Sequence, residues 1–146
     1  MSNGRKRRVS GCPIDYGLDI FGDRWTLLVI RDLLFARKRH FKELMKSPER
    51  IASNILTARL KKLEERGLIA RCGDPDNRKQ VIYTLTDKGR DLTPVLVEMA
   101  RWGGRYDPNT PVPKSFVTRF ARDNDQLIAD VCAAMAGAAH KVKPRR

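Results

Sequence analysis

Long apolar runs and clustered cysteines are absent from this sequence of 146 residues. No apolar stretch approaches the roughly 20 residues that cross a bilayer, and no apolar segment follows the basic N-terminus to form a signal peptide. Cys12, Cys72 and Cys132 are too few and too widely spaced for a disulfide framework or a zinc site. Neither His40 nor His140 has a carboxylate or cysteine partner at ligand spacing. We therefore expect a cytoplasmic protein without a metal, another cofactor or a membrane partner.

The signatures of an enzyme are missing as well. The sequence has no glycine-rich phosphate loop, no pair of carboxylates spaced for acid–base catalysis and no set of metal ligands. Its length fits one domain with an appended helix, and a hydrophobic fraction of 41% supports a modest core. We therefore expect a binding protein and not an enzyme.

Positive charge is what the sequence has in excess. Its 30 Lys and Arg residues and 17 Asp and Glu residues give a net charge of +13, which favours an anionic partner such as nucleic acid. Four positive charges lie in residues 5–8 and four in residues 141–146, so the region between holds +5. We expect a disordered basic arm over residues 1–11 and a disordered basic tail over 140–146. Solvated disorder and phosphate binding both remain open for these ends.

The segment over residues 53–68, SNILTARLKKLEERGL, is predicted to be a helix with two different faces. Ser53 can cap its start, and Gly67 can supply the left-handed conformation that ends it. One face carries Leu56, Leu60 and Leu63. The opposite face carries Asn54, Thr57, Ala58, Lys61 and Lys62. We expect the leucines to join a core and the polar face to contact the major groove of DNA.

A short helix and a turn are expected before this segment. The spacing of Phe41, Leu44 and Met45 predicts one or two helical turns, and a Ser-Pro pair within residues 46–50 predicts a turn. A short helix, a turn and a longer helix with a polar outer face form the helix-turn-helix pattern, although any helical hairpin shares it.

A β-hairpin is expected directly after the helix. Residues 68–72 and 80–85 have the composition of strands, and residues 73–79 between them are dense in turn formers. The tip carries Arg78 and Lys79, which can meet the minor groove or backbone phosphates. A hairpin in this position converts the helix-turn-helix into a winged helix.

Two further helices are expected on the N-terminal side. The first covers residues 14–21 after Pro13. The second, capped by Asp23, is apolar on most of its sides and is expected to be the central helix of the core, with Arg31 and Asp32 on one exposed edge. Four aromatic residues are assigned to the core: Tyr16, Phe21, Trp25 and Trp102.

The C-terminal side is expected to hold the dimer contacts. Thr86 can cap a helix in which Pro94 causes a kink or a late start, and which ends at Trp102 before a glycine pair. Residues 107–113 have the composition of a linker. Residues 114–139 are expected to form a helical segment whose apolar side suits dimerisation.

Several stretches resemble one family. They are DRWTLLVIRDLLF, FKEL, NILTARLKKLEERGLI and VIYTLTDKG, with Cys12-Pro13 before them and Trp102-Gly103 after them. This set is similar to the HxlR-type winged helix-turn-helix regulators, a MarR-like group of bacterial transcription factors, over residues 12–102. The resemblance implies a dimer that binds an inverted repeat as repressor or activator. In some members the cysteine near the N-terminus senses electrophiles or oxidants, and Cys12 occupies that position. The chain departs from the usual pattern after Tyr106, where it is longer.

The expected fold is therefore mainly α with a small β-hairpin wing. A winged helix-turn-helix domain covers residues 12–106, and a C-terminal dimerisation helix follows it. The candidate DNA-binding residues of the recognition helix are Ser53, Asn54, Thr57, Ala58, Arg59, Lys61 and Lys62. The candidate phosphate contacts are Arg37, Lys38, Arg39, Lys42, Arg78 and Lys79. Asn54 can bind adenine through two hydrogen bonds, and Thr57 can meet a thymine methyl group.

The expected function is sequence-specific regulation of transcription, by repression, through an inverted-repeat operator in double-stranded DNA bound by a homodimer. The signal would be an oxidant or electrophile acting through Cys12, with Cys132 as its resolving partner, or a small ligand. Two alternatives stay open. A winged-helix module that binds protein would need an apolar outer face on the recognition helix. Sequence-blind nucleic-acid binding by the basic tails would be lost when the tails are removed.

Overall fold

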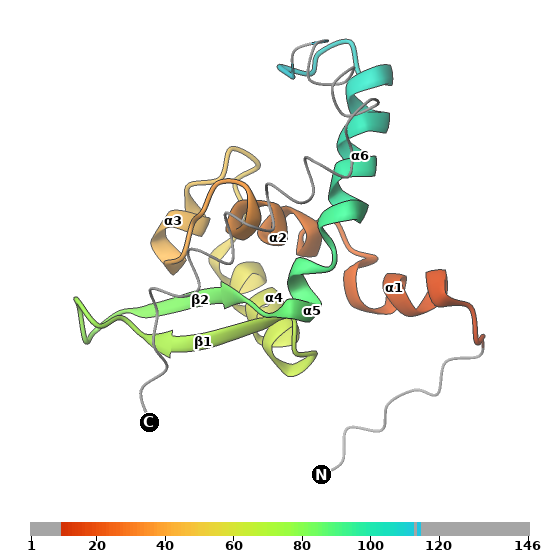
Figure 1. Cartoon of the computed structure of the whole chain (residues 1–146). Helices are drawn as coiled ribbons and strands as arrows, with labels where there is room; N and C mark the ends of the chain where they lie inside the picture. The colour runs from red at the N-terminus through yellow and green to blue at the C-terminus, as the bar shows by residue number, and fades with distance from the viewer. Residues whose placement is uncertain (1–9, 113, 115–146) are drawn as a thin grey trace.

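The computed structural model describes residues 10–112 and 114, and within them it contains six helices and one two-stranded antiparallel sheet (Figure 1). In chain order the elements are α1 (Pro13–Phe21), α2 (Thr26–Leu34), α3 (Phe41–Met45), α4 (Ser53–Glu65), β1 (Ile69–Gly73), β2 (Val81–Leu85), α5 (Asp87–Arg90) and α6 (Thr93–Tyr106). The order and types of these elements confirm the expected winged helix-turn-helix. None of the described helices has the length and apolar character needed to pass through a membrane.

The core forms around α2, which contacts α1, α4, α6 and β2. Its buried apolar side chains are Val29, Ile30, Leu33 and Leu34. On α4, Leu56, Leu60 and Leu63 are at most 3% exposed, which confirms that the three leucines face inward. Burial of one such side chain stabilises a fold by about 1.5–3 kcal/mol, so this packing fixes which face of α4 points outward.

The two ends of α4 differ in how well the sequence predicted them. Gly67 has φ +75° and, as expected, terminates the helix. Its N–H donates to the Glu64 carbonyl at 3.0 Å, and the next N–H donates to the Leu63 carbonyl at 2.9 Å. The expectation that Ser53 caps the start is wrong, because Ala52 occupies the cap position and no side chain caps the helix. Ile51, only 5% exposed, anchors the chain just before the helix, and this burial outweighs one capping bond of about 1 kcal/mol.

The hairpin pairs residue 69 with 85 and residue 73 with 81. Its inner end joins the core, since Ile69 and Leu85 are buried. The segment before α3 is hydrogen-bonded to the free edge of β2, because the Tyr83 N–H donates to the Arg39 carbonyl at 2.9 Å. The hairpin therefore leaves the core beside α3 and α4 (Figure 1).

Two predictions about helix ends, those for Thr86 and Pro94, are confirmed. At the start of α2 the cap position is occupied by Trp25, and Asp23 Oδ1 accepts from the backbone N–H groups at residues 25 and 26, at 2.8 and 2.9 Å, in the turn that leads into the helix. Thr86 Oγ1 accepts from the N–H of Gly89 at 3.2 Å and caps α5. Pro94 lies in the first turn of α6, which starts late, after α5 has ended.

The expected end of α6 at Trp102 is wrong. The helix continues through the glycine pair to Tyr106. A glycine costs a helix only about 1 kcal/mol, and the rings of Trp102 and Tyr106 contact each other one turn apart, with centroids 5.3 Å apart. The assignment of Tyr16 and Trp102 to the core is also wrong, because they are 40% and 69% exposed, whereas Phe21 and Trp25 do pack against the core. Tyr16 and Trp102 lie on the outer faces of α1 and α6.

Part of the expected organisation lies outside the described residues. This holds for most of the basic arm, for all of the dimerisation segment over 114–139 except residue 114, for the tail over 140–146, and for Cys132. The domain boundaries drawn from the sequence therefore stay predictions.

Candidate nucleic-acid interface

The outer face of α4 is polar and exposed. Asn54, Thr57, Ala58 and Lys61 are all exposed, and Ser53 is exposed at the start of the helix. The Thr57 hydroxyl donates to the Ser53 carbonyl at 2.8 Å, a bond within the helix. Lys61 Nζ lies 4.0 Å from Glu65 Oε1, a surface contact of little energetic weight. The helix thus presents hydrogen-bonding groups and a threonine methyl along one side, as the spacing predicted.

Arg59 departs from the expected outward placement. It follows Leu56 by three residues and is half-buried at the edge of the apolar face. Its Nη1 lies 3.4 Å from Oδ2 of Asp23. Burial raises the pKa of this carboxyl, but hydrogen bonds from Thr26 and Trp25 and the charge of Arg59 bring the pKa below its ordinary value. Arg59 therefore ties α4 to the start of α2 and does not point away from the protein.

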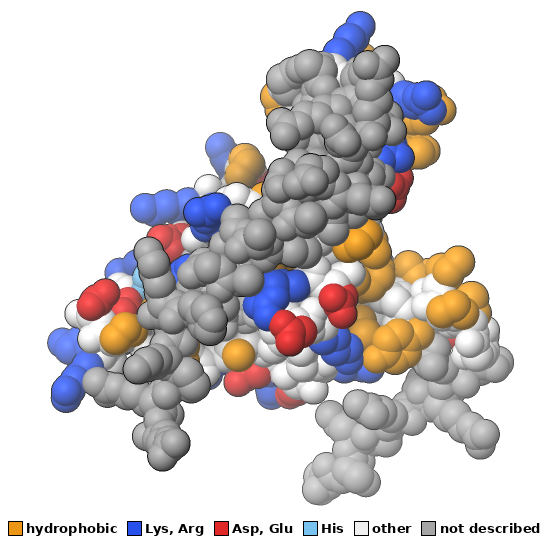
Figure 2. All heavy atoms as spheres, in the orientation of Figure 1, with side chains coloured by type: hydrophobic (Ala, Val, Ile, Leu, Met, Phe, Trp, Pro, Cys, Tyr) orange, Lys and Arg blue, Asp and Glu red, His pale blue; other side chains and the backbone are white. Residues whose placement is uncertain are grey.

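The tip of the hairpin is basic and tightly shaped. Arg78 and Lys79 are exposed, and Lys and Arg side chains are visible at this end of the molecule in Figure 2. Asn77 shapes the tip through two hydrogen bonds. Its side-chain oxygen accepts from the N–H of Lys79 at 3.2 Å, and its backbone carbonyl accepts from the N–H of Gln80 at 2.9 Å. These bonds fix the backbone from which the two cations extend.

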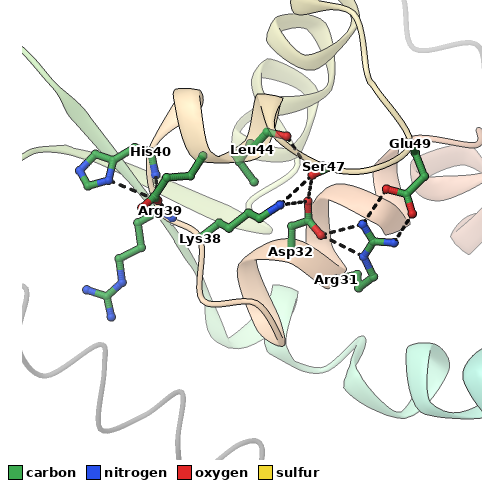
Figure 3. A network of polar contacts seen from close by, with 9 residues as sticks. Arg31, Asp32, Lys38, Arg39, His40, Leu44, Ser47 and Glu49 are labelled. Atoms are coloured by element: carbon green, nitrogen blue, oxygen red, sulfur yellow. Dashed lines mark hydrogen bonds and ion pairs between the residues drawn. The ribbon is translucent and has the colours of Figure 1, made fainter. Parts of the chain in front are cut away.

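Three cations in the connection between α2 and α3, together with Lys42 on α3, divide into two groups. Arg37 and Lys42 are exposed, and the Arg39 side chain extends away from the neighbouring polar network (Figure 3). Lys38 instead turns inward, and its Nζ donates to Asp32 at 3.1 Å and to Ser47 at 3.0 Å. The interpretation of Lys38 as a phosphate contact is therefore not supported by its placement.

A polar network joins α2 to the turn of the helix-turn-helix (Figure 3). Asp32 is 4% exposed and accepts from Lys38, from Ser47 and from two nitrogens of Arg31 at 2.9 and 2.7 Å. The expectation that Asp32 faces an exposed edge is wrong, because Asp32 is buried and two of its partners, Lys38 and Ser47, lie on other segments that the helical pattern does not reveal. Arg31 also donates two hydrogen bonds to the carboxylate of Glu49. These two bonds lower the pKa of the Glu49 carboxyl to about 2.

His40 has a role that the sequence did not reveal. Its ring lies 2.8 Å from Asp74 on the hairpin and 3.3 Å from Glu43 on α3. The Glu43 carboxylate also accepts from the backbone N–H of His40 at 2.9 Å, at the start of α3. The hydrogen bond with Asp74, followed by the charge of Glu43, raises the pKa of His40 above its ordinary value. The only local signal was a glutamate three residues after the histidine.

Cys12 is exposed and occupies the cap position at the N-terminal end of α1. Its backbone N–H donates to the hydroxyl of Ser10 at 3.0 Å. Cys72 is half-buried on β1. Among the described residues, no three His, Cys, Asp or Glu side chains come together as a metal site would require.

Comparison with known proteins agrees with this architecture. A sequence profile described as HxlR-like helix-turn-helix matches residues 20–111. The uncharacterised HTH-type transcriptional regulator YdeP of Bacillus subtilis is 38% identical over 96 residues, which cover 66% of this chain and 74% of YdeP.

Solved structures give the same result. The crystal structure of PA1607, described as a candidate transcription factor, matches with a TM-score of 0.65 at 37% identity. The match covers 72% of this chain and 73% of the PA1607 chain. The reduced form of the transcriptional regulator YodB from B. subtilis has a TM-score of 0.55 at 32% identity, covering 69% of this chain and 99% of YodB. A quinone-bound YodB structure matches with a TM-score of 0.54 at 33% identity, covering 65% and 100%. The chain therefore belongs to the HxlR-like helix-turn-helix family and is a transcriptional regulator of the winged-helix fold.

Proposed function

We propose that the chain binds an inverted-repeat operator as a homodimer and represses transcription there. The observation that carries this proposal is the division of α4 between three buried leucines and an exposed polar side. On a duplex, α4 would lie in the major groove. Asn54 would make paired hydrogen bonds with adenine, and Thr57, whose hydroxyl donates to its own helix, would offer its methyl group to thymine.

Phosphate contacts would place the helix without reading sequence. The exposed cations Arg37, Lys42, Arg78 and Lys79 lie on the segments that flank α4 in a winged helix, and Arg39 and Lys61 add to them. Arg59 and Lys38 pair with carboxylates within the protein, so we do not include them among the phosphate contacts. The half-buried Lys62 and the exposed Ser53 and Ala58 remain candidates at the edge of the contact.

The dimer would form through the apolar surfaces of α1 and α6. Ile14 and Leu18, one turn apart on α1, are 72% and 56% exposed, and Met99, Trp102 and Tyr106 on α6 are 54%, 69% and 63% exposed. Exposed apolar surface of this extent marks an interaction site. A groove of about 590 Å³ beside Trp102, lined also by Pro94, Val95, Glu98 and Met99, offers a seat for side chains of a second copy. The predicted segment over 114–139 would extend this interface.

The outer surface of α4 also weighs against binding to a protein partner. A protein-binding module would need apolar anchors there, and Asn54, Thr57 and Lys61 provide none. Selection of bound fragments from random duplex DNA tests the proposal directly. Enrichment of one inverted repeat supports it. Binding without an enriched motif, which disappears when residues 1–11 and 140–146 are removed, would support sequence-blind binding by the tails instead.

A second proposal concerns Cys12 as the point at which an oxidant or a quinone-like electrophile acts. Cys12 is exposed at the end of α1, beside the surface proposed for dimerisation. A chemical modification of Cys12 would change the proposed dimer contacts. The structure of the relative YodB has been solved with quinone bound. The test is operator binding before and after a mild oxidant or benzoquinone, in the wild type and in Cys12→Ser. Loss of binding only in the wild type supports the proposal. Unchanged binding by protein that is fully modified at Cys12 contradicts it.

A further inference from the structure

We propose that His40 is a positioning residue for the wing, because its ring ties Asp74 at the base of the hairpin tip to the start of α3. This tie would hold the basic tip against the DNA backbone. The inference rests on the proposed function and adds to it a named connection between the helix-turn-helix and the wing.

The ring of His40 is held on both sides. Nε2 lies 2.8 Å from Oδ2 of Asp74, whose side chain is only 10% exposed. Nδ1 lies 3.3 Å from Oε2 of Glu43. That same oxygen accepts from the backbone N–H groups of Arg39 at 2.8 Å and His40 at 2.9 Å, so it is itself fixed in place. The ring therefore bridges a fixed point on α3 and a carboxylate on the hairpin.

Asp74 also shapes the tip that it anchors. Its Oδ1 accepts from the N–H of Asp76 at 2.9 Å, and its own N–H donates to the Gln80 carbonyl at 2.9 Å. Arg78 and Lys79 lie within the turn that these bonds close. A two-stranded hairpin is marginally stable by itself, so its direction depends on ties to the body of the protein. The His40 contact is such a tie and is placed where the strand meets the tip.

The protonation state of the ring decides how many of these contacts form. Asp74 from the hairpin and Glu43 from α3 are the charged groups that face it. Only the imidazolium form donates from both nitrogens, whereas a neutral ring turns one lone pair toward a carboxylate oxygen and loses that contact. The hydrogen bond with Asp74 raises the pKa of His40. Both contacts are therefore present below the raised pKa, and the tie loosens as pH rises through it.

Operator binding by the full chain at several pH values tests this inference. Between about pH 6 and about pH 8.5 the wild type should lose roughly twofold to fivefold more affinity than His40→Gln, which cannot titrate. Groups that do not contact His40 are the same in both proteins, so their contributions cancel in the comparison. In an Arg78→Gln/Lys79→Gln background, His40→Gln should have no further effect, because the cations that it positions are gone. Equal pH profiles for wild type and His40→Gln would overturn the inference.

A measurement without DNA separates this inference from the proposed function. The His40 ring is titrated by NMR in the wild type and in Asp74→Asn, which keeps an oxygen to accept from the N–H of Asp76 but removes the charge. The pKa of His40 should fall toward its ordinary value in the variant, and an unchanged pKa would show that the tie does not exist. A wild type that enriches no DNA motif would contradict the proposed function, while the ring titration would still decide whether the tie forms.

Discussion

The guanidinium of Arg31 holds the carboxylate of Glu49 through two hydrogen bonds, 2.6 Å from Nη1 to Oε1 and 2.9 Å from Nη2 to Oε2. Arg31 lies on α2, and Glu49 lies in the turn between α3 and α4. A forked pair of this kind fixes orientation as well as distance. Together with Asp32 and Ser47, it attaches the helix-turn-helix to the central helix of the core.

Replacement of Glu49 by Gln should lower the free energy of unfolding by about 1 kcal/mol near neutral pH, because the charge-assisted pair with a partly exposed Arg31 is lost. The pKa of Glu49 in the fold is about 2, below its ordinary value of 4.5. Its contribution is therefore present above the ordinary value and is lost as pH falls toward about 2. Chemical denaturation between these pH values measures it.

The matched control for this experiment is Glu65→Gln, whose carboxylate makes an exposed contact with Lys61 at 4.0 Å. That variant should stay within about 0.5 kcal/mol of the wild type. A difference between wild type and Glu49→Gln that is the same at every pH would contradict the assigned role of the ion pair.

Two adjacent residues on α4 should separate folding from DNA binding. Leu56 is 0% exposed, and Leu56→Ala should cost about 2–5 kcal/mol of stability. Thr57 is exposed, and Thr57→Ala should leave stability within about 0.5 kcal/mol while it weakens operator binding roughly fivefold to a hundredfold. Thermal unfolding and a DNA titration give the two readouts. Thr57→Ala protein that binds the operator as tightly as the wild type would remove this residue from the interface.

The basic tip should appear in the salt dependence of binding. Arg78→Gln/Lys79→Gln should reduce the slope of log affinity against log salt by about 2 for each protomer, because each phosphate contact contributes a slope of about 1. Arg105→Gln on the far part of α6 is the control, since α6 extends away from the hairpin (Figure 1). Equal slopes in the double variant and the control would mean that the tip does not touch the DNA.

The apolar surface of α6 should be needed for dimerisation. Trp102 is 69% exposed, so Trp102→Asp should leave the fold intact while it places a charge in the proposed interface. Sedimentation should show monomers at concentrations where the wild type is a dimer, and circular dichroism should show an unchanged helix content. The Arg78→Gln/Lys79→Gln variant should remain dimeric. A Trp102→Asp protein that sediments as the wild type does would place the interface elsewhere.

Local patterns predicted most of the fold correctly. The spacing of the leucines determined the inner face of α4, and Gly67, Thr86 and Pro94 act on helix ends through their own backbone or the nearest turn. These effects depend on neighbours within about four residues, so a single sequence displays them.

Contacts between distant segments could not be predicted in the same way. The Asp32–Ser47 bond spans 15 positions and the His40–Asp74 bond spans 34, and neither pair has a spacing that marks it. The same limit explains why Lys38 and Arg59 were expected to face DNA, since a lysine or arginine pattern does not show which cations pair within the protein. Trp102 was assigned to the core because large aromatic side chains are usually buried, and its exposure on α6 requires the structure.

Selection of binding sites from random duplexes by wild type and by Asn54→Ala tests the central claim most directly. The wild type should enrich an inverted repeat, and the variant should enrich the same repeat with its preference relaxed at one position in each half-site, since a lost pair of hydrogen bonds to one base removes about 1–3 kcal/mol of discrimination. Identical preferences for the two proteins, or no enriched repeat for the wild type, would contradict the claim that the polar face of α4 reads DNA sequence.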